Sequence, residues 1–209
     1  FAGADPANGD ALYYVNEAGG DPNATTNDFN EANYITLGSP LPTMIGGIGN
    51  TFSWKGLTLD VRFQGQSGNK IYLSGDIFNS CNACWFDNQT LSQLDRWQQP
   101  GDVTQVPQAR LGQSNGDDGR SSRYVSDGSY LRLKNVTLAY DLPSKWFKRN
   151  GIQSLRLYAT GTNLLTFTNY VGWDPEVTAD YIADNVTYGI DFYSAPQPKS
   201  FVGGIRVGF

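Results

Sequence analysis

Histidine is absent from the 209 residues of this chain, and only 17% of the residues are charged. Without histidine, the chain lacks the usual general base near neutral pH and the most common metal ligand, so Ser-His and Cys-His catalysis is excluded. Acidic residues outnumber basic ones by 20 to 15, which leaves no basic surface for a phosphate backbone. We therefore predict no enzyme activity, no metal or other cofactor, and no nucleic-acid partner.

Long apolar runs are also missing. No segment approaches the roughly 18 apolar residues of a membrane helix, and the chain does not open on a signal segment. Its first residue, Phe1, is not an initiator methionine, so we expect a processed or partial chain. Glycine and aromatic residues are abundant instead, with 24 Gly and an aromatic fraction of 13%. This composition excludes a coiled coil, a disordered acidic tail and a typical helical enzyme.

Five segments alternate between apolar and polar residues, as half-buried β-strands do. They lie near 43–54, 57–66, 129–142, 153–168 and 200–209. The clearest is 57–66, where every second residue is apolar and the residues between are polar. Lys55-Gly56 between the first two segments predicts a tight hairpin. The apolar parity switches near Lys134, which predicts a β-bulge there.

The lengths of the strands and loops favour a membrane barrel over a β-sandwich. Strands of about 10–14 residues exceed the usual 5–6, and ten residues at about 40° of tilt rise about 25 Å, the height of an outer-membrane apolar band. Connections after the first and third strands are short, whereas those after the second and fourth, 67–128 and 169–199, are long. Outer-membrane barrels combine short periplasmic turns with long extracellular loops in this way.

The predicted fold is therefore an all-β, antiparallel segment of a transmembrane barrel, with residues 1–41 as an extracellular loop and 42–209 as barrel strands and loops. Five strands cannot close a membrane barrel, because the smallest has eight, so the remaining strands must come from elsewhere. The alternative is a secreted β-sandwich that binds carbohydrate through its loop aromatics.

Several strings resemble the C-terminal strands of SusC/RagA-type TonB-dependent outer-membrane transporters. They are SYLRLKNVTLAY at 129–140, the turn Leu142-Pro143, SLRLYATGTNLLTFTNY at 154–170 and WDPEV at 173–177. The resemblance extends to 51–69, 94–102, 106–110 and 195–209. Each string alone reads as a strand or loop, but together they are specific.

This resemblance implies the last five strands of a 22-stranded barrel in the outer membrane of a Gram-negative bacterium of the Bacteroidetes. It also implies a plug, a TonB-contact segment in the absent N-terminal part and a SusD-like surface lipoprotein that caps the barrel. The expected function is import of oligosaccharides or peptides, with this chain forming barrel wall and extracellular mouth.

The alternation assigns each strand residue to a face. The residues expected to face lipid are Leu57, Leu59, Val61, Phe63, Phe201, Ile205, Val207 and Phe209. The residues expected to face the lumen, along the transport path or paired with strands and plug, are Asp60, Arg62, Gln64 and Arg206. Loop aromatics expected to contact substrate or the capping lipoprotein are Trp85, Phe86, Trp97, Trp173, Phe192 and Tyr193, with packing between the loops as the alternative.

Two further groups lie in the loops. Cys81 and Cys84 form a lone CxxC; a zinc site would need more ligands, so we favour a local disulfide, with free thiols as the alternative. Five loop carboxylates could ligate calcium, but their spacing matches no EF-hand, so solvated loop charge is the favoured interpretation. They are Asp174, Glu176, Asp180, Asp184 and Asp191.

Overall fold

A computed structural model describes the chain except for residues 16–19, 82–86, 117–119, 148–150, 178 and 180–186. The described residues are mostly strands and loops, with one short α-helix, α1 (Asp76–Asn79). None of their helices has the length and apolar character that crossing a membrane requires. The chain divides into two compact units. The loop unit comprises Phe1–Gly38, Lys70–Ser126 and Thr178–Tyr193; the sheet unit comprises Ser39–Asn69, Asp127–Val177 and Ser194–Phe209.

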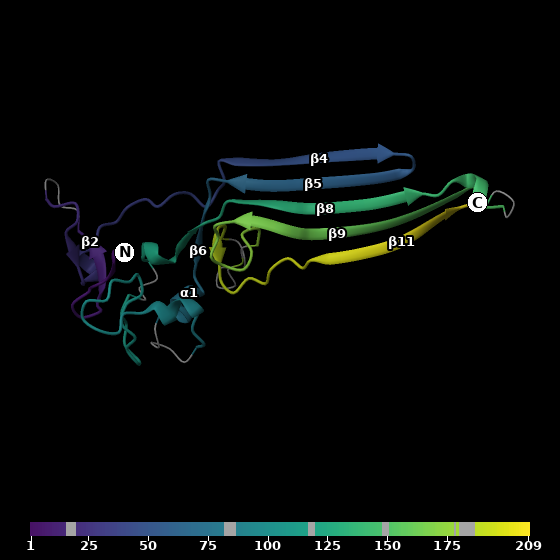
Figure 1. The fold of residues 1–209 in the computed structure, drawn as a ribbon. Helices are drawn as coiled ribbons and strands as arrows, with labels where there is room; N and C mark the ends of the chain where they lie inside the picture. Colours follow the sequence, from purple (N-terminus) through teal and green to yellow (C-terminus); the bar gives the residue numbers. More distant parts are fainter. Residues whose placement is uncertain (16–19, 82–86, 117–119, 148–150, 178, 180–186) are drawn as a thin grey trace. The chain divides into compact units, whose positions relative to one another are not determined.

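The sheet unit is built on one antiparallel sheet of five long strands. These are β4 (Met44–Trp54), β5 (Leu57–Ser67), β8 (Tyr130–Asp141), β9 (Ser154–Thr168) and β11 (Ser200–Gly208). Their order across the sheet is β11-β9-β8-β5-β4, so each strand lies beside the next long strand in the sequence. Figure 1 shows the five strands running side by side, with the shorter β11 beside part of β9. The predicted all-β, antiparallel fold is confirmed.

The short connections all lie at one end of this sheet. The β4–β5 turn, the β8–β9 connection and the C-terminus meet at the same end in Figure 1. The register agrees, because Trp54 pairs with Leu57, Leu57 with Tyr140, Tyr140 with Leu157, and Leu157 with Ile205. The long connections therefore join the strands at the other end of the sheet.

The β4–β5 turn has the backbone of a two-residue hairpin. Lys55 has φ 46° and Gly56 has φ 86°, and positive φ at both central residues matches the twist of the flanking strands. A Cβ added to Gly56 would lie 2.8 Å from the Asp141 carbonyl oxygen. Glycine is thus required here both by φ and by the close approach of β8.

The β-bulge predicted near Lys134 is confirmed. Arg62 pairs with Asn135 and Phe63 with Leu133, so Lys134 is the extra residue in β8. The β8–β9 register shifts at the same place, where Asn163 has a positive φ of 54°. The bulge restores the apolar residues on both sides of it to one face of the sheet.

The loop unit contains two small sheets and its own core. The strand order is β1 (Gly3–Ala4), β2 (Ala11–Tyr14), β3 (Thr25–Thr26) in one sheet and β10 (Ile190–Asp191), β6 (Lys70–Leu73), β7 (Val125–Asp127) in the other. The core includes Tyr13, Ile71, Trp97 and Tyr124. Asn115 joins distant segments, because its Oδ1 accepts from the Ala11 N–H and its Nδ2 donates to the Gly9 and Gln108 carbonyls.

The sequence pattern predicts two separate loops, at 1–41 and 67–128. In the structure, these segments do not stay separate. Most of both segments packs into one unit, in which buried rings form a core and long-range hydrogen bonds such as those of Asn115 satisfy backbone groups outside the strands.

Candidate functional site

The five-stranded sheet has one apolar and one largely polar face. Directly paired residues of neighbouring antiparallel strands point to the same face. One cross-strand row is Trp54, Leu57, Tyr140, Leu157 and Ile205, and the next is Phe52, Leu59, Leu138, Ala159 and Gly203. Val61 and Phe63 continue this face along β5, and Phe201 and Val207 along β11, with Asn50 as a polar exception.

Within the described residues of the sheet unit, no second layer covers the apolar face. Exposed fractions reach 78% at Phe201, 70% at Ile48 and 59% at Phe52. A β-sandwich would bury such residues against a second sheet, so the sandwich alternative is wrong for the described part of the chain. The physical reason is that the apolar rows of all five strands fall on one face, and each strand is already paired within a single layer.

Hydroxyl, carboxamide and charged groups dominate the opposite face. One row is Thr51, Asp60, Thr137, Thr160 and Val202, and the next is Gly49, Arg62, Asn135, Thr162 and Ser200. Asp60 accepts hydrogen bonds from the Thr51 hydroxyl at 2.7 Å and from Arg62 Nε at 3.1 Å. Three of the residues expected to face the lumen, Asp60, Arg62 and Gln64, thus lie together.

The fourth, Arg206, lies near the end with the short connections, directly across from Arg156. Arg156 forms an ion pair of 3.3 Å with Asp141. Both partners of this pair are substantially exposed, so it contributes little to stability.

A buried ion cluster fixes the loop after β9 to the polar face at the bulge. Arg132 on β8 contacts Asp174 at 2.5 Å and Glu176 at 2.6 Å, and Lys134 contacts Glu176 at 2.7 Å. Arg132 Nε also donates to the Thr166 hydroxyl on β9 at 2.9 Å. The side chains of Arg132 and Asp174 are only 3% and 4% exposed. Proteins tolerate buried charges when the charges are paired and hydrogen-bonded, as they are here.

Asp174 holds both ends of that loop. It accepts hydrogen bonds from the backbone N–H groups of Glu176 and Gln197, both at 2.9 Å. Burial alone would raise the pKa of Asp174, but the hydrogen bonds from Arg132 and from these two backbone groups outweigh it, and the pKa lies below its ordinary value.

The expectation of solvated loop charge is wrong for three of the five carboxylates. Asp174 and Asp191 are buried, and Glu176 is half-buried and paired twice. Asp174 and Glu176 pair with Arg132 and Lys134, which lie about 40 residues earlier in the sequence. No local sequence pattern links residues so far apart. Asp180 and Asp184 lie outside the described residues. No group of three or more acidic or cysteine ligands that could hold a metal occurs in the described part of the chain.

A groove of about 1180 Å³ lies beside the bulge in the sheet unit. Its lining includes the glycines Gly47 and Gly49 of β4 and the polar residues Thr51, Asp60, Arg62, Gln64, Lys134, Asn135 and Thr137. The sequence pattern predicted the alternation of these strands. It did not predict the groove, because the groove forms only when β4, β5 and β8 pair.

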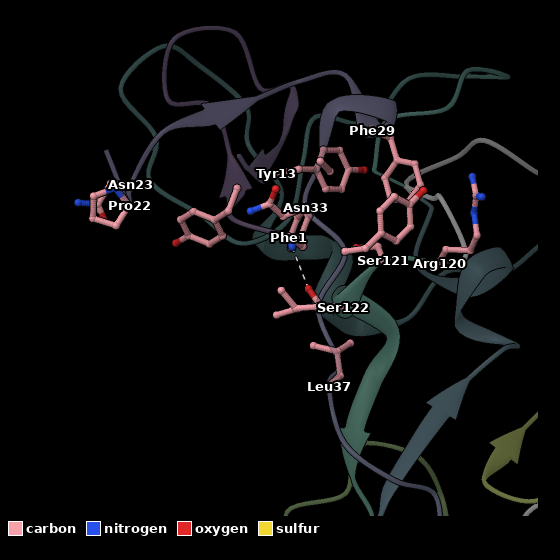
Figure 2. A pocket seen from close by; sticks show the side chains of 14 residues that line it. Phe1, Tyr13, Pro22, Asn23, Phe29, Asn33, Leu37, Arg120, Ser121 and Ser122 are labelled. Carbon is pink, nitrogen blue, oxygen red and sulfur yellow. Dashed lines mark hydrogen bonds between the residues drawn. The ribbon is translucent and has the colours of Figure 1, made fainter. Parts of the chain in front are cut away.

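The loop unit carries a second cavity, of about 370 Å³, lined by aromatic and polar side chains. Tyr13 makes edge-to-face contacts with Phe1 and Phe29, with ring centroids 5.9 and 5.1 Å apart. Figure 2 shows these rings on one side of the cavity, with Pro22 and Asn23 across from them. The size and the mixture of rings and hydrogen-bonding groups are typical of sites for small ligands. No local sequence pattern indicates this cavity.

The described loop aromatics that were expected to contact substrate differ in their surroundings. Trp97 is buried and its indole N–H donates to the Pro6 carbonyl at 3.2 Å, which agrees with the packing alternative. Trp173 is 75% exposed. Phe192 packs edge-to-face on Tyr193, with ring centroids 4.7 Å apart, and Tyr193 is half-exposed. Trp85 and Phe86 lie outside the described residues.

Cys81 is buried and disulfide-bonded. Its expected partner, Cys84, lies outside the described residues, so the pairing remains a prediction.

A long antiparallel sheet with an uncovered apolar face and an opposite polar face defines a segment of a transmembrane β-barrel wall. No family model matches the chain, but individual proteins do. It is 34% identical over 178 residues to TonB-dependent receptor P3 of Formosa agariphila, covering 83% of this chain and 17% of the receptor. It is 31% identical over 108 residues to TonB-dependent receptor SusC of Bacteroides thetaiotaomicron, covering 51% of this chain and 10% of the receptor.

Solved structures agree with these relatives. The RagAB peptide transporter superposes with a TM-score of 0.78 at 31% identity, covering 99% of this chain and 22% of that chain. The RagAB peptide importer in its closed-closed state gives a TM-score of 0.80 at 31% identity, with the same coverage. The chain thus belongs to the SusC/RagA-type TonB-dependent outer-membrane receptors, as a segment of the barrel. It spans less than a fifth of the length of the curated relatives it matches.

Proposed function

We propose that this chain forms barrel wall and extracellular mouth in a TonB-dependent outer-membrane importer of oligosaccharides or peptides. The observation that carries the proposal is the register of the five strands, which aligns their apolar residues on one uncovered face. An apolar face of that size is stable only against lipid or another apolar layer, and the relatives are outer-membrane receptors. No catalytic activity is proposed, because the relatives are receptors and transporters.

In this proposal the apolar face contacts lipid. Strands of 9 to 15 residues have about the length needed to cross the apolar band at the tilt of such barrels. The lipid-facing residues would be Leu57, Leu59, Val61, Phe63, Phe201, Ile205, Val207 and Phe209. The polar face would line the lumen, with Asp60, Arg62, Gln64 and Arg206 among its residues.

The two edges of the sheet require partners. Among the described strands, β4 and β11 each have one hydrogen-bonded neighbour, and an open strand edge in hydrocarbon costs several kcal/mol for each unpaired group. Strands from the remainder of the receptor would pair with both edges and close the barrel around its plug. Contact with TonB would belong to the N-terminal part of that receptor.

The loop unit would then form part of the mouth, on the extracellular side of a Gram-negative bacterium of the Bacteroidetes. Its aromatic cavity, together with Trp173, Phe192 and Tyr193, would contact the substrate or a SusD-like surface lipoprotein. The RagAB structures are those of a peptide importer, which supports peptide as one of the two substrate classes.

A matched pair of substitutions in the β4–β5 hairpin tests the assigned facing. In the full-length receptor, Val61→Arg places a charge on the apolar face, and Ser53→Arg places the same charge on the polar face, where Ser53 is exposed and pairs with the uncharged Thr58. We expect Val61→Arg to lower the free energy of unfolding by ~2–4 kcal/mol and Ser53→Arg to change it by less than ~1 kcal/mol. Denaturant unfolding in lipid vesicles, followed by the shift of the folded band on unheated gels, measures both. Equal losses for the two variants would contradict the facing.

A further inference from the structure

The end of the sheet that carries the short connections is rich in cations. Its described residues lie at 53–58, 139–147, 151–156 and 204–209. The charged side chains among them are four cations and one carboxylate: Lys55, Lys145, Arg156, Arg206 and Asp141. The chain as a whole has the opposite balance, with 20 acidic and 15 basic residues. Positive charge is therefore concentrated at this end of the sheet.

Two lysines at this end have no counter-charge among the described residues. Arg156 pairs with Asp141, and Arg206 lies directly across from Arg156 on the same polar face. Lys55 and Lys145 are exposed, and neither forms an ion pair with another described residue. Their charges are available to an anion outside this chain.

Lys55 lies at the border of the apolar face. Its Nζ is 4.9 Å from the centroid of the Trp54 ring, and Trp54 pairs with Leu57 in the first row of that face. Trp54 is 69% exposed. Tryptophan is enriched where a membrane protein passes from hydrocarbon to headgroups, and the stem of a lysine follows apolar surface while its ammonium group reaches polar surroundings. Trp54 and Lys55 have the arrangement expected of residues at this border.

A second lysine and tryptophan follow β8. Lys145 and Trp146 end the short 3-10 helix η4 (Ser144–Trp146), and Trp146 is 66% exposed. This helix begins three residues after Asp141, whose N–H donates to the Gly56 carbonyl at 2.8 Å. Two adjacent connections therefore each present an exposed lysine next to an exposed tryptophan in the sequence.

We propose that Lys55 and Lys145 bind the anionic headgroups of phospholipids in the periplasmic leaflet of the outer membrane. In the proposed barrel this end is periplasmic, because outer-membrane barrels have short turns on that side. The tryptophan rings lie at the headgroup ends of the acyl chains, and the ammonium groups lie at the phosphates. A basic residue at a membrane surface favours anionic lipid about fivefold. The inference rests on the proposed function, because it requires the apolar face to contact lipid.

Quenching by brominated lipids tests the proposal. In the full-length receptor in lipid vesicles, a fluorescent amino acid replaces Leu57, which lies on the apolar face beside Trp54. The vesicles contain phosphatidylcholine and phosphatidylglycerol, and only one of the two lipids carries bromine in its acyl chains. Comparison of the two preparations gives the preference of the lipid site next to position 57 for the anionic lipid. We expect phosphatidylglycerol to be preferred at least about fivefold.

Removal of the two charges should abolish this preference. The double change Lys55→Gln and Lys145→Gln is expected to bring the preference to within about twofold of parity. Lys199→Gln is the control, because Lys199 is also exposed and without an ion pair among the described residues, but it precedes β11 at the other end of the sheet. The control should leave the preference unchanged.

Salt gives a second measure that needs no substitution. A rise in ionic strength from about 0.1 M to about 1 M shortens the Debye length from about 10 Å to about 3 Å. The preference of the native receptor for phosphatidylglycerol should therefore fall to near parity at the higher salt concentration.

The outcomes separate failure of the inference from failure of the proposed function. Equal quenching by the two lipids, or a preference that survives the double change or high salt, would overturn the inference, while the quenching itself preserves the facing. Absence of quenching by either lipid at position 57 would overturn the facing, and the inference with it.

Discussion

Asp174 shows how one side chain determines the path of a long loop. It pairs with Arg132 on β8 and accepts backbone hydrogen bonds from Glu176, two residues further on, and from Gln197, three residues before β11 begins. Because Arg132 and Asp174 are both nearly fully buried, either charge without the other would remain in a low-dielectric site. The cluster therefore holds the two ends of this loop in one arrangement against β8.

Replacement of Asp174 by asparagine tests this role. Asp174→Asn leaves Arg132 with Glu176 only, and breaking a buried pair costs about 3 kcal/mol. Asp141→Asn is the control, because its pair with Arg156 is exposed and should cost less than ~1 kcal/mol. The measurement is the free energy of unfolding of the full-length receptor in lipid vesicles at pH 7. Equal effects of the two changes would mean that burial of the cluster contributes nothing.

The depressed pKa of Asp174 adds a dependence on pH. Its folded pKa lies below the ordinary value of 3.8, so the stability that it contributes is fully present at neutral pH and is lost as the pH falls through the folded pKa. The stability difference between the native receptor and Asp174→Asn should therefore be largest at pH 7 and shrink below pH 3.8. A difference that persists in strong acid would exclude this ionisation as its source.

At the scale of elements, the β4–β5 hairpin depends on its two turn residues in different ways. Gly56 has φ 86° and lies against the Asp141 carbonyl, whereas Lys55 has φ 46° and a side chain that extends over the Trp54 ring, with Nζ 4.9 Å from the centroid. The turn therefore requires glycine at position 56. Position 55 requires only a residue that tolerates a positive φ.

Substitutions in this turn should differ accordingly. Gly56→Ala is expected to lower the free energy of unfolding by ~1–3 kcal/mol through strain and the clash with β8. Lys55→Asn should be neutral or stabilising, because Asn-Gly is preferred in this turn type. Folding yield and unfolding of the full-length receptor in lipid vesicles would measure both, and tolerance of alanine at position 56 would show that the turn has another backbone conformation in the receptor.

For the whole molecule, the decisive property is an apolar sheet face that the described residues leave exposed. Phe201, Ile48 and Ile205 are each about 70% exposed or more, and they belong to strands at opposite edges of the same sheet. Contiguous exposed apolar surface of this extent associates with lipid, with another protein or with itself. The chain is therefore suited to be part of a larger barrel.

The solubility of residues 1–209 produced alone tests this property. In plain buffer we expect the chain to aggregate, and in detergent we expect it to remain dispersed, because detergent covers the apolar face and self-association covers it otherwise. Analytical ultracentrifugation distinguishes the two states. A stable monomer in buffer without detergent would contradict the exposed face and the membrane assignment together.

Local patterns in the sequence were sufficient to locate the five long strands, the Lys55-Gly56 turn and the bulge at Lys134. Strand side chains alternate with a period of two, so each face can be assigned from neighbouring residues, and a break in parity indicates an extra residue. The same reasoning was wrong for Asp174 and Glu176, because their partners Arg132 and Lys134 lie about 40 residues away in the sequence and no local pattern links them.

The tertiary structure decided what depends on contacts between distant segments. It placed Gly47 and Gly49 beside Arg62, Gln64 and the bulge to form a groove, and it joined three separate stretches into the loop unit. It also showed that the apolar rows of five strands share one uncovered face, which distinguishes a barrel wall from a sandwich. Alternation is a property of the local backbone and is therefore present in the sequence, whereas register, burial and cavities arise only when strands far apart in the chain pair.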